Sequence, residues 1–87
     1  MMNNYQSILQ GIFLCGEQDV CNVVANEEAK IVIDLRAEAS ESAAEPGTAQ
    51  WIHIPLEGGK PNQAALIKEA IQHVVAAYNE GKRAVVH

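Results

Sequence analysis

Basic residues are few in this chain. Its 87 residues include 6 lysines and arginines against 11 acidic residues, which gives a formal net charge of -5. Proteins that bind nucleic acid or anionic membranes need basic surface to displace counterions, so the composition excludes a general binder of either kind. It does not exclude a small anionic substrate, because backbone N–H groups can hold phosphate on an acidic protein.

Cysteine pairs, metal-ligand spacings and long apolar runs are also lacking. Cys15 and Cys21 form no disulfide framework and no zinc-type spacing, so we expect two reduced, mostly buried thiols. The three histidines are too scattered for a metal site, and no cofactor motif is found. The longest early apolar run, at residues 12–14, is too short for a signal or membrane core, which predicts a cytoplasmic protein.

The remaining pattern alternates strands with helices, in a length suited to a single domain. The clearest helix is amphipathic, with Asn62 as its expected N-cap and Gly81 as its expected C-cap. We expect Pro55 to end a strand, since proline cannot donate to a sheet ladder. The predicted elements are two short strands around Gly11 (7–16), a helix that Asp19 opens, strands at 31–36 and 51–56, a helix at 62–79 and a strand at 84–87.

Two connecting segments lack a clear pattern. Residues 37–50, with Pro46, are expected to form a helical turn or a surface loop. Residues 57–62, with adjacent glycines, are expected to form a flexible loop. The whole order predicts a three-layer α/β fold with a largely parallel sheet and right-handed crossovers. Because no helix follows the last strand, one sheet face is expected to lack cover, which a longer domain, a partner chain or an oligomer would supply.

Polar residues at strand ends are the candidate site residues. Asp34 and Arg36 end a buried strand at its carboxyl end, where open α/β sheets place their ligands, although a solvated pair that simply ends the strand is the alternative. His87 ends the last strand and is more often structural than catalytic in such a place. His53 is expected on the opposite sheet face from Ile52 and Ile54, and His73 at the boundary of its helix's apolar stripe.

Four segments, in order, resemble the cysteine-dependent protein tyrosine and dual-specificity phosphatases, and bacterial dual-specificity members in particular. The segment at 8–16 resembles "I-x-x-G-[LI]-[YF]-[LI]-[GS]", and 31–36 resembles "V-[IL]-[ND]-L-R". The segment at 51–56 resembles "Y-x-x-I-P-[LV]", which precedes the general-acid loop. The last one, 81–87, resembles "G-K-x-[VA]-[LV]-V-H", which leads into the phosphate-binding loop. The resemblance implies a phosphatase-like α/β domain over residues 1–87, as the N-terminal part of a longer one.

The resemblance also implies a mechanism. A cysteine thiolate attacks phosphorus to form a phosphocysteine, and an arginine clamps the phosphate oxygens. His87 matches the histidine of the family's H-C-x-x-x-x-x-R signature, so the cysteine and arginine would lie beyond it, and His87 would orient the loop. Cys15 and Cys21 do not match the nucleophile. The family's general-acid aspartate falls at Gly58, which makes the neighbouring Glu57 the candidate acid. Substrates would be phosphorylated proteins or small phosphate esters.

Two other functions stay open. Residues 33–36 and 53–56 also resemble the "I-D-[VL]-R" and "[GH]-x-I-P" segments of rhodanese-like sulfurtransferases. The segment at 11–16 and His87 favour the phosphatase. The third hypothesis is a non-catalytic half-domain that binds a partner, since no nucleophile is present at the site.

Overall fold

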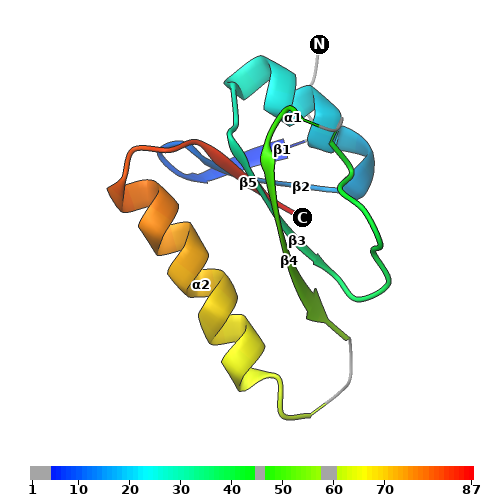
Figure 1. Ribbon diagram of the computed structural model, residues 1–87. Coiled ribbons are helices and arrows are strands. Elements are labelled where there is room, and N and C mark those ends of the chain that lie inside the picture. The colour runs from blue at the N-terminus through cyan, green and yellow to red at the C-terminus, as the bar shows by residue number, and fades with distance from the viewer. Residues whose placement is uncertain (1–4, 45–46, 58–60) are drawn as a thin grey trace.

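A five-stranded mixed sheet forms the centre of the molecule, as the computed structural model shows for residues 5–44, 47–57 and 61–87 (Figure 1). The strand order is β1-β2-β5-β3-β4. Predictions for Pro46 and for residues 58–60 lie outside the described residues. The elements are β1 (Tyr5–Leu9), β2 (Ile12–Cys15), the 3-10 helix η1 (Glu17–Asp19), α1 (Val20–Glu27), β3 (Ile31–Arg36), β4 (Gln50–Leu56), α2 (Ala64–Asn79) and β5 (Ala84–Val86).

The central strand of the sheet is β5, although it comes last in the chain. It pairs in parallel with β2 on one side and with β3 on the other, and β4 pairs in parallel with β3 at the edge. Among the described strand pairs, only the β1–β2 hairpin is antiparallel. Its turn holds Gly11 at a φ of 82°, which glycine adopts without strain. The predicted strand pair around Gly11 and the largely parallel sheet are therefore confirmed.

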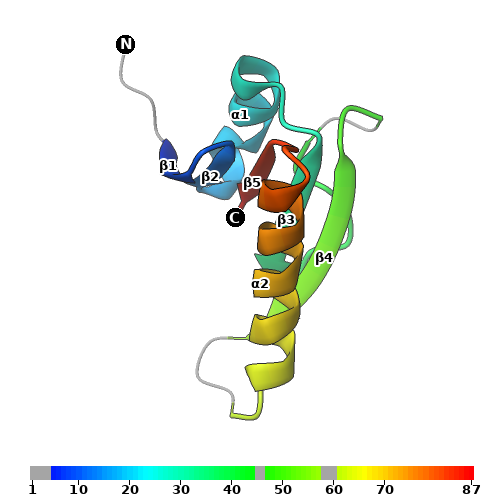
Figure 2. The same ribbon diagram turned by 90° about the vertical axis from the view of Figure 1, so that its left-hand side faces the viewer.

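A separate core lies on each face of the sheet, because strand side chains alternate between faces. On one face α1 packs against the sheet through Val20 and Val23, together with Val32 and Val85. On the other face α2 packs through Ala70 and Ala77, with the partly buried Leu66 and Val74 beside them. This second core contains Ile12, Ile31, Ile33, Ile54, Ala70, Ala77, Ala84 and Val86. The predicted three-layer α/β architecture is thus observed (Figures 1 and 2).

The face that carries α2 is only partly covered. Figure 2 shows α2 in front of β3 and β4, while β1 and β2 lie to one side with no helix in front of them. Leu14 of β2, two residues after Ile12, points to this same face and is 43% exposed. The expectation of an incompletely covered sheet face holds for the part of the chain that the structure describes.

Two local predictions were wrong in detail, and the structure decides between two alternatives for a third segment. The strand that contains Pro55 continues to Leu56, since β4 is an edge strand and the exposed Pro55 needs no ladder partner there. The N-cap position of α2 is Gln63 instead of Asn62, whose φ of 64° is left-handed. Residues 37–44 and 47–49 form turns and bends, so the loop alternative is correct there.

The helix ends and the cysteines agree with the predictions in part. Asp19 occupies the N-cap of α1, but its side chain makes no capping hydrogen bond. Gly81 follows the C-cap of α2 at a φ of 70°, as expected of a helix-ending glycine. The two cysteines are unpaired; Cys15 is partly buried, but Cys21 is exposed, so the prediction of mostly buried thiols was wrong for Cys21.

Candidate active site at the carboxyl edge of the sheet

His87 is attached to β3 by its backbone. Its N–H donates to the carbonyl of Ile33 at 3.1 Å, and its own carbonyl accepts from the N–H of Leu35 at 2.8 Å. These two bonds continue the β3–β5 ladder by one residue. The imidazole is buried, and its Nε2 lies 3.8 Å from Oδ2 of Asp34. The carboxyl ends of the two central strands therefore bring a histidine and a carboxylate together.

Asp34 is fully buried, and its carboxylate accepts four hydrogen bonds. Oδ1 accepts from the backbone N–H of Arg36 at 3.0 Å and from Nε of the same residue at 3.0 Å. Oδ2 accepts from Nη2 of Arg36 at 2.8 Å and from Nε1 of Trp51 at 2.9 Å. A buried charge of this kind is tolerated because it is paired and hydrogen-bonded.

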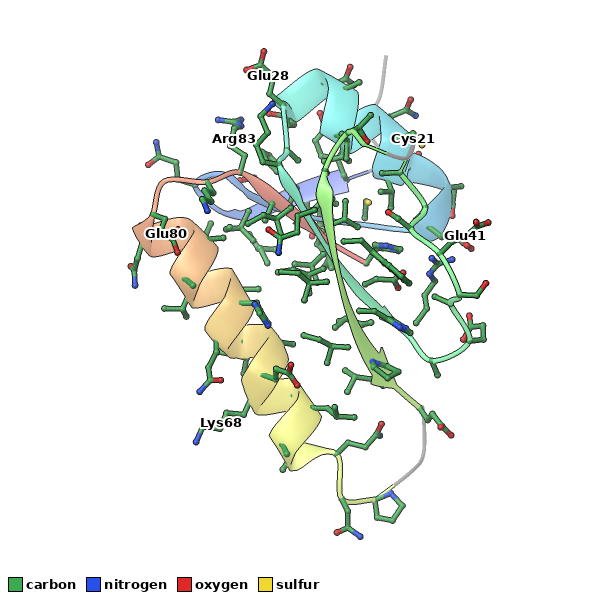
Figure 3. The ribbon with its side chains drawn as sticks, in the orientation of Figure 1. Cys21, Glu28, Glu41, Lys68, Glu80 and Arg83 are labelled. Atoms are coloured by element: carbon green, nitrogen blue, oxygen red, sulfur yellow. The ribbon has the colours of Figure 1, made fainter. Side chains whose placement is uncertain are left out.

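Arg36 connects four parts of the chain. Its guanidinium grips Asp34 with a two-nitrogen fork, pairs with Glu17 of η1, and donates to the carbonyl of Glu41 at 3.1 Å. Figure 3 shows Glu41 in the loop that follows β3. The carbonyl of Arg36 lies 2.6 Å from Nε2 of His53 on β4. The guanidinium is thus held by protein carboxylates at this edge.

Trp51 and His53 complete the site from β4. They share one strand face, as residues two apart must, and their rings stack with centroids 5.1 Å apart. Since the core on α2's side contains Ile52 and Ile54, the prediction that His53 faces the opposite side is confirmed. Sequence analysis did not assign Trp51 or Glu17 to the site. The available signal was the spacing of Trp51 and His53 on a strand parallel to β3.

The two titratable groups at the centre differ in charge at neutral pH, because one is ionised and the other is neutral. Burial alone would raise the pKa of Asp34, but hydrogen bonds from Arg36 and Trp51 lower it to about 2. Burial lowers the pKa of His87, and Arg36 adds to this effect while Asp34 and Glu17 oppose it. Asp34 is therefore a carboxylate and His87 a neutral imidazole. Both ring nitrogens of His87 are buried without a hydrogen-bond partner among the described residues.

The structure places the four predicted site residues in two groups. Asp34, Arg36 and His87 converge as described above. Glu57 follows β4 on the exposed loop, one residue beyond Leu56, which pairs with Arg36 in the register. Its backbone N–H and carbonyl both bond the amide of Gln63 at 2.6 Å, which ties the two ends of this loop together. Glu57 thus lies at the same edge, on the far side of β3 from His87.

The two cysteines have different surroundings. Burial, with the nearby charge of Asp19, raises the pKa of Cys15 to about 11, which keeps its thiol protonated. Cys21 donates its S–H to the carbonyl of Ala43 at 3.1 Å. Among residues 5–44, 47–57 and 61–87, no three potential ligands converge as a metal site would require. Neither described helix has the length and apolar character that crossing a bilayer requires.

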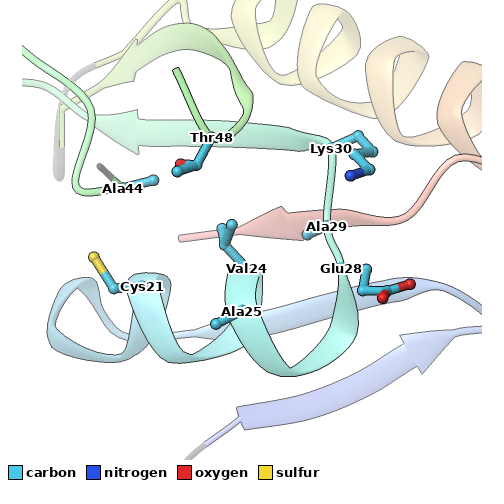
Figure 4. A pocket seen from close by; sticks show the side chains of 8 residues that line it. All are labelled: Cys21, Val24, Ala25, Glu28, Ala29, Lys30, Ala44 and Thr48. Atoms are coloured by element: carbon cyan, nitrogen blue, oxygen red, sulfur yellow. The ribbon is translucent and has the colours of Figure 1, made fainter. Parts of the chain in front are cut away.

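A separate cavity of about 430 Å³ lies at the opposite end of β3 (Figure 4). It opens between α1 and the loop before β4, with Glu28 and Lys30 at one end and Cys21 at the other (Figure 4). Its lining residues are Cys21, Val24, Ala25, Glu28, Ala29, Lys30, Ala44 and Thr48. None of them belongs to the cluster around Asp34, so this cavity is distinct from the candidate active site.

Several solved structures, three of which are given below, resemble this fold. No family model and no curated protein matches the sequence. The OH1 tyrosine phosphatase of Orf virus, described as having triple substrate specificity, has a TM-score of 0.76 and 18% identity, covering 95% of this chain and 49% of its own. A candidate dual-specificity phosphatase of mouse, crystallised with zinc tungstate, has a TM-score of 0.73 and 8% identity, with 95% and 53% covered.

The third similar structure is a candidate phosphatase (DUF442) from Shewanella putrefaciens CN-32. Its TM-score is 0.62 at 16% identity, with 97% of this chain and 60% of the other covered. The fold is therefore that of tyrosine and dual-specificity phosphatases. The present chain spans about half of the length of two of these structures and three fifths of the third.

Proposed function

We propose that this chain carries part of the active site of a cysteine-dependent phosphatase, a phosphoric monoester hydrolase that works through a phosphocysteine. The observation that carries the proposal is the placement of His87. It is buried beside Asp34 at the end of the central strand, in a fold shared with tyrosine and dual-specificity phosphatases. In this proposal the nucleophilic cysteine follows His87, and the phosphate-clamping arginine lies six residues after that cysteine.

The edge of the sheet suits this chemistry. A loop that starts at the carboxyl end of a central parallel strand can direct backbone N–H groups at an anion, and these groups stabilise both a thiolate and phosphate oxygens. His87, as a neutral and buried imidazole, would orient this loop and transfer no proton. Phosphorylated proteins and small phosphate esters are the proposed substrates. A cytoplasmic location stays a prediction.

Glu57 is the proposed general acid, because it is the carboxyl group on the loop after β4. The paired hydrogen bonds to Gln63 would fix where this loop starts. Asp34 and Arg36 were expected to bind substrate at the site mouth. Since Arg36 grips Asp34 and Glu17, we propose that the pair forms the wall behind the phosphate site and that direct phosphate contact falls to the later arginine.

A partner-binding half-domain is the second candidate, and one observation favours it. Within the described part of the chain, seven large apolar side chains are each 43% to 57% exposed. Four form a second stripe on α2, turned by one residue from the buried stripe, and three lie on the hairpin. Tyr78 of that stripe shares a hollow with Gly11 of the hairpin turn, so this end of the stripe lies next to the hairpin. We call Ile8, Leu9, Leu14, Ile67, Ile71, Val75 and Tyr78 the open apolar surface.

An apolar surface of this extent is normally covered in a working protein. In the phosphatase proposal, the polypeptide that brings the cysteine and arginine also packs on it. In the half-domain proposal, a partner chain or a second copy does so. The two proposals therefore differ in what covers the same surface.

The test starts with the intact mass of the purified protein and the sequence of its C-terminal peptide. A mass above the 9.4 kDa of these 87 residues, with cysteine after His87 and arginine six residues later, would support the phosphatase. Hydrolysis of an aryl phosphate, lost when that cysteine becomes serine, would complete the support. Sulfur transfer from thiosulfate without phosphate release would overturn it in favour of the sulfurtransferase. A mass of 9.4 kDa with a stable partner complex would favour the half-domain.

A further inference from the structure

The imidazole of His87 has no hydrogen-bond partner at either ring nitrogen within the described part of the chain, although its side chain is 99% buried. A buried polar group left without a partner is costly, so a native structure normally satisfies it. A neutral imidazole needs two different partners, because one nitrogen donates and the other accepts. Which nitrogen carries the hydrogen decides what each neighbour of the ring must be.

Asp34 selects the nitrogen that carries the hydrogen. Its ionised carboxylate only accepts, and Oδ2 lies 3.8 Å from Nε2. A hydrogen on Nε2 points a positive dipole at this negative charge, whereas a lone pair on Nε2 would be repelled by it. At 3.8 Å the contact is electrostatic and longer than a hydrogen bond, but it acts in a buried site where such forces are weakly screened.

Burial keeps the ring neutral, and the three charged groups near it act in different directions. His87 is influenced by Asp34 and Arg36 of β3 and by Glu17 of η1. Arg36 bonds both acids, and its positive charge opposes protonation of the ring, which the two carboxylates favour. Burial then keeps His87 uncharged, and an uncharged ring with hydrogen on Nε2 has a lone pair on Nδ1.

We propose that Asp34 is a positioning residue, which holds His87 in the tautomer protonated at Nε2, so that Nδ1 accepts a backbone N–H of the phosphate-binding loop. The orientation of His87 by Asp34 rests on this structure alone, while the role of the loop rests on the proposed function. In this arrangement Asp34 never touches phosphate. Asp34 acts on the loop only through the imidazole of His87. The backbone of His87 is itself hydrogen-bonded to β3.

The first experiment measures the tautomer of His87 by long-range proton–nitrogen NMR on the purified protein at neutral pH. We expect Nε2 to carry the hydrogen and Nδ1 to show the shift of an unprotonated nitrogen. Asp34→Asn should change the tautomer ratio by roughly tenfold, because the amide that replaces the carboxylate can donate as well as accept. Trp51→Phe is the matched control, since it removes one bond to the same oxygen but keeps the charge, and it should keep the Nε2–H form.

Two results would overturn the inference. One is a wild-type ring protonated at Nδ1, a result that needs no variant to fold. The other is an Asp34→Asn protein with an unchanged tautomer ratio.

The second experiment compares two replacements of His87 in the protein that hydrolyses phosphate. Asparagine places an acceptor oxygen near the position of Nδ1, and glutamine places its polar atoms near Nε2. If Nδ1 is the working acceptor, His87→Asn should keep roughly tenfold more kcat than His87→Gln. Equal losses would overturn the role in the loop.

The proposed function and the orientation of His87 by Asp34 can fail separately. A protein without phosphatase activity, but with an Asp34-dependent tautomer, would overturn the proposed function and support the orientation of His87 by Asp34. An active phosphatase whose His87 tautomer ignores Asp34 would overturn this inference and leave the proposed function in place.

Discussion

Trp51 and Asp34, 17 residues apart in the chain, are joined by a 2.9 Å hydrogen bond from Nε1 to Oδ2. This bond ties the edge strand β4 to the fully buried carboxylate of β3. It also leaves the second carboxylate oxygen to Arg36 alone. The indole therefore does more than fill space beside His53.

Trp51→Phe should lower the free energy of unfolding by about 1.5 to 3 kcal/mol, because the lost bond is to a charged group. Phenylalanine keeps an aromatic ring beside His53 but removes the donor to a buried charged oxygen. Urea denaturation followed by circular dichroism measures the loss. Ile52→Val, on the opposite face of the same strand, is the control, and it should cost about 1 kcal/mol through its lost methylene alone. A loss no larger than the control would contradict the role assigned to this bond.

Stability should fall with acid in two separable steps. The pKa of Asp34 is lowered from 3.8 to about 2, so its carboxylate contributes fully above about pH 4 and progressively loses its contribution towards pH 2. The pKa of His87 is lowered below 6.5, so the unfolded chain takes up that proton first, and stability falls as the pH drops below about 6.5. Denaturation midpoints between pH 2 and 8 measure both steps.

Each step has its own variant. His87→Gln should flatten the upper step, and Asp34→Asn the lower one, which is worth about 2 kcal/mol. A profile that loses both steps in a single variant would mean that the two groups titrate as one unit.

Two residues with left-handed backbone offer an opposed pair of substitutions. Gly81 has a φ of 70° with open space where a Cβ would stand, so Gly81→Ala should cost about 1 kcal/mol through backbone strain alone. Glu28 ends α1 with a φ of 55°, so Glu28→Gly should gain about 0.5 kcal/mol. Thermal midpoints measure both shifts. Glu28→Ala keeps the strain and serves as control; a gain there would assign the effect to the lost carboxylate.

A charge placed on the open apolar surface should reduce self-association of the 87-residue chain. Ile71→Glu should reduce self-association of the 87-residue chain and change its unfolding free energy by less than about 0.5 kcal/mol, since Ile71 is exposed. In the complete protein or partner complex it should destabilise, because the charge would then be buried. Gln72→Glu, the neighbouring exposed residue with the same change in charge, should have neither effect. Light scattering and denaturation midpoints decide between these outcomes.

Glu57→Gln tests the proposed acid in a protein that hydrolyses phosphate. It should lower kcat by about 10²-fold or more on an alkyl phosphate, whose leaving group needs a proton, and much less on an aryl phosphate. The alkaline limb of the pH–rate profile should disappear. Glu69→Gln on α2 is the control for a lost exposed carboxylate. Equal losses on both substrates would remove Glu57 from this role.

The sequence predicted the elements whose pattern is local. Three local patterns each specify one element, and all three elements are observed. They are the β-branched run before Asp34, the glycine at the hairpin turn, and the apolar residues of α2 that recur at helical spacing. Placing Asp34 and His87 at one edge also followed, because parallel strands share their carboxyl ends. The approach of the two side chains to 3.8 Å was not predictable, since it depends on β5 pairing directly with β3.

The remaining partners of the site depend on tertiary pairing. Trp51 reaches Asp34 only because the register pairs Asp34 with His53, two residues further along β4. Glu17 meets Arg36 across 19 residues of chain, and no spacing rule links them. The start of α2 was misplaced for a local reason, since the left-handed backbone of Asn62 belongs to the loop before the helix.

The position of β5 has a consequence for how the molecule folds. The β1–β2 hairpin and the β3–β4 pair share no ladder of their own, and only β5 joins them. During synthesis, the edges of β2 and β3 that face each other stay unpaired until β5, the last described strand, is made and inserts between them. Such late, long-range closure slows folding and exposes strand edges to aggregation. Production of this protein should therefore respond to chaperones and to slower synthesis.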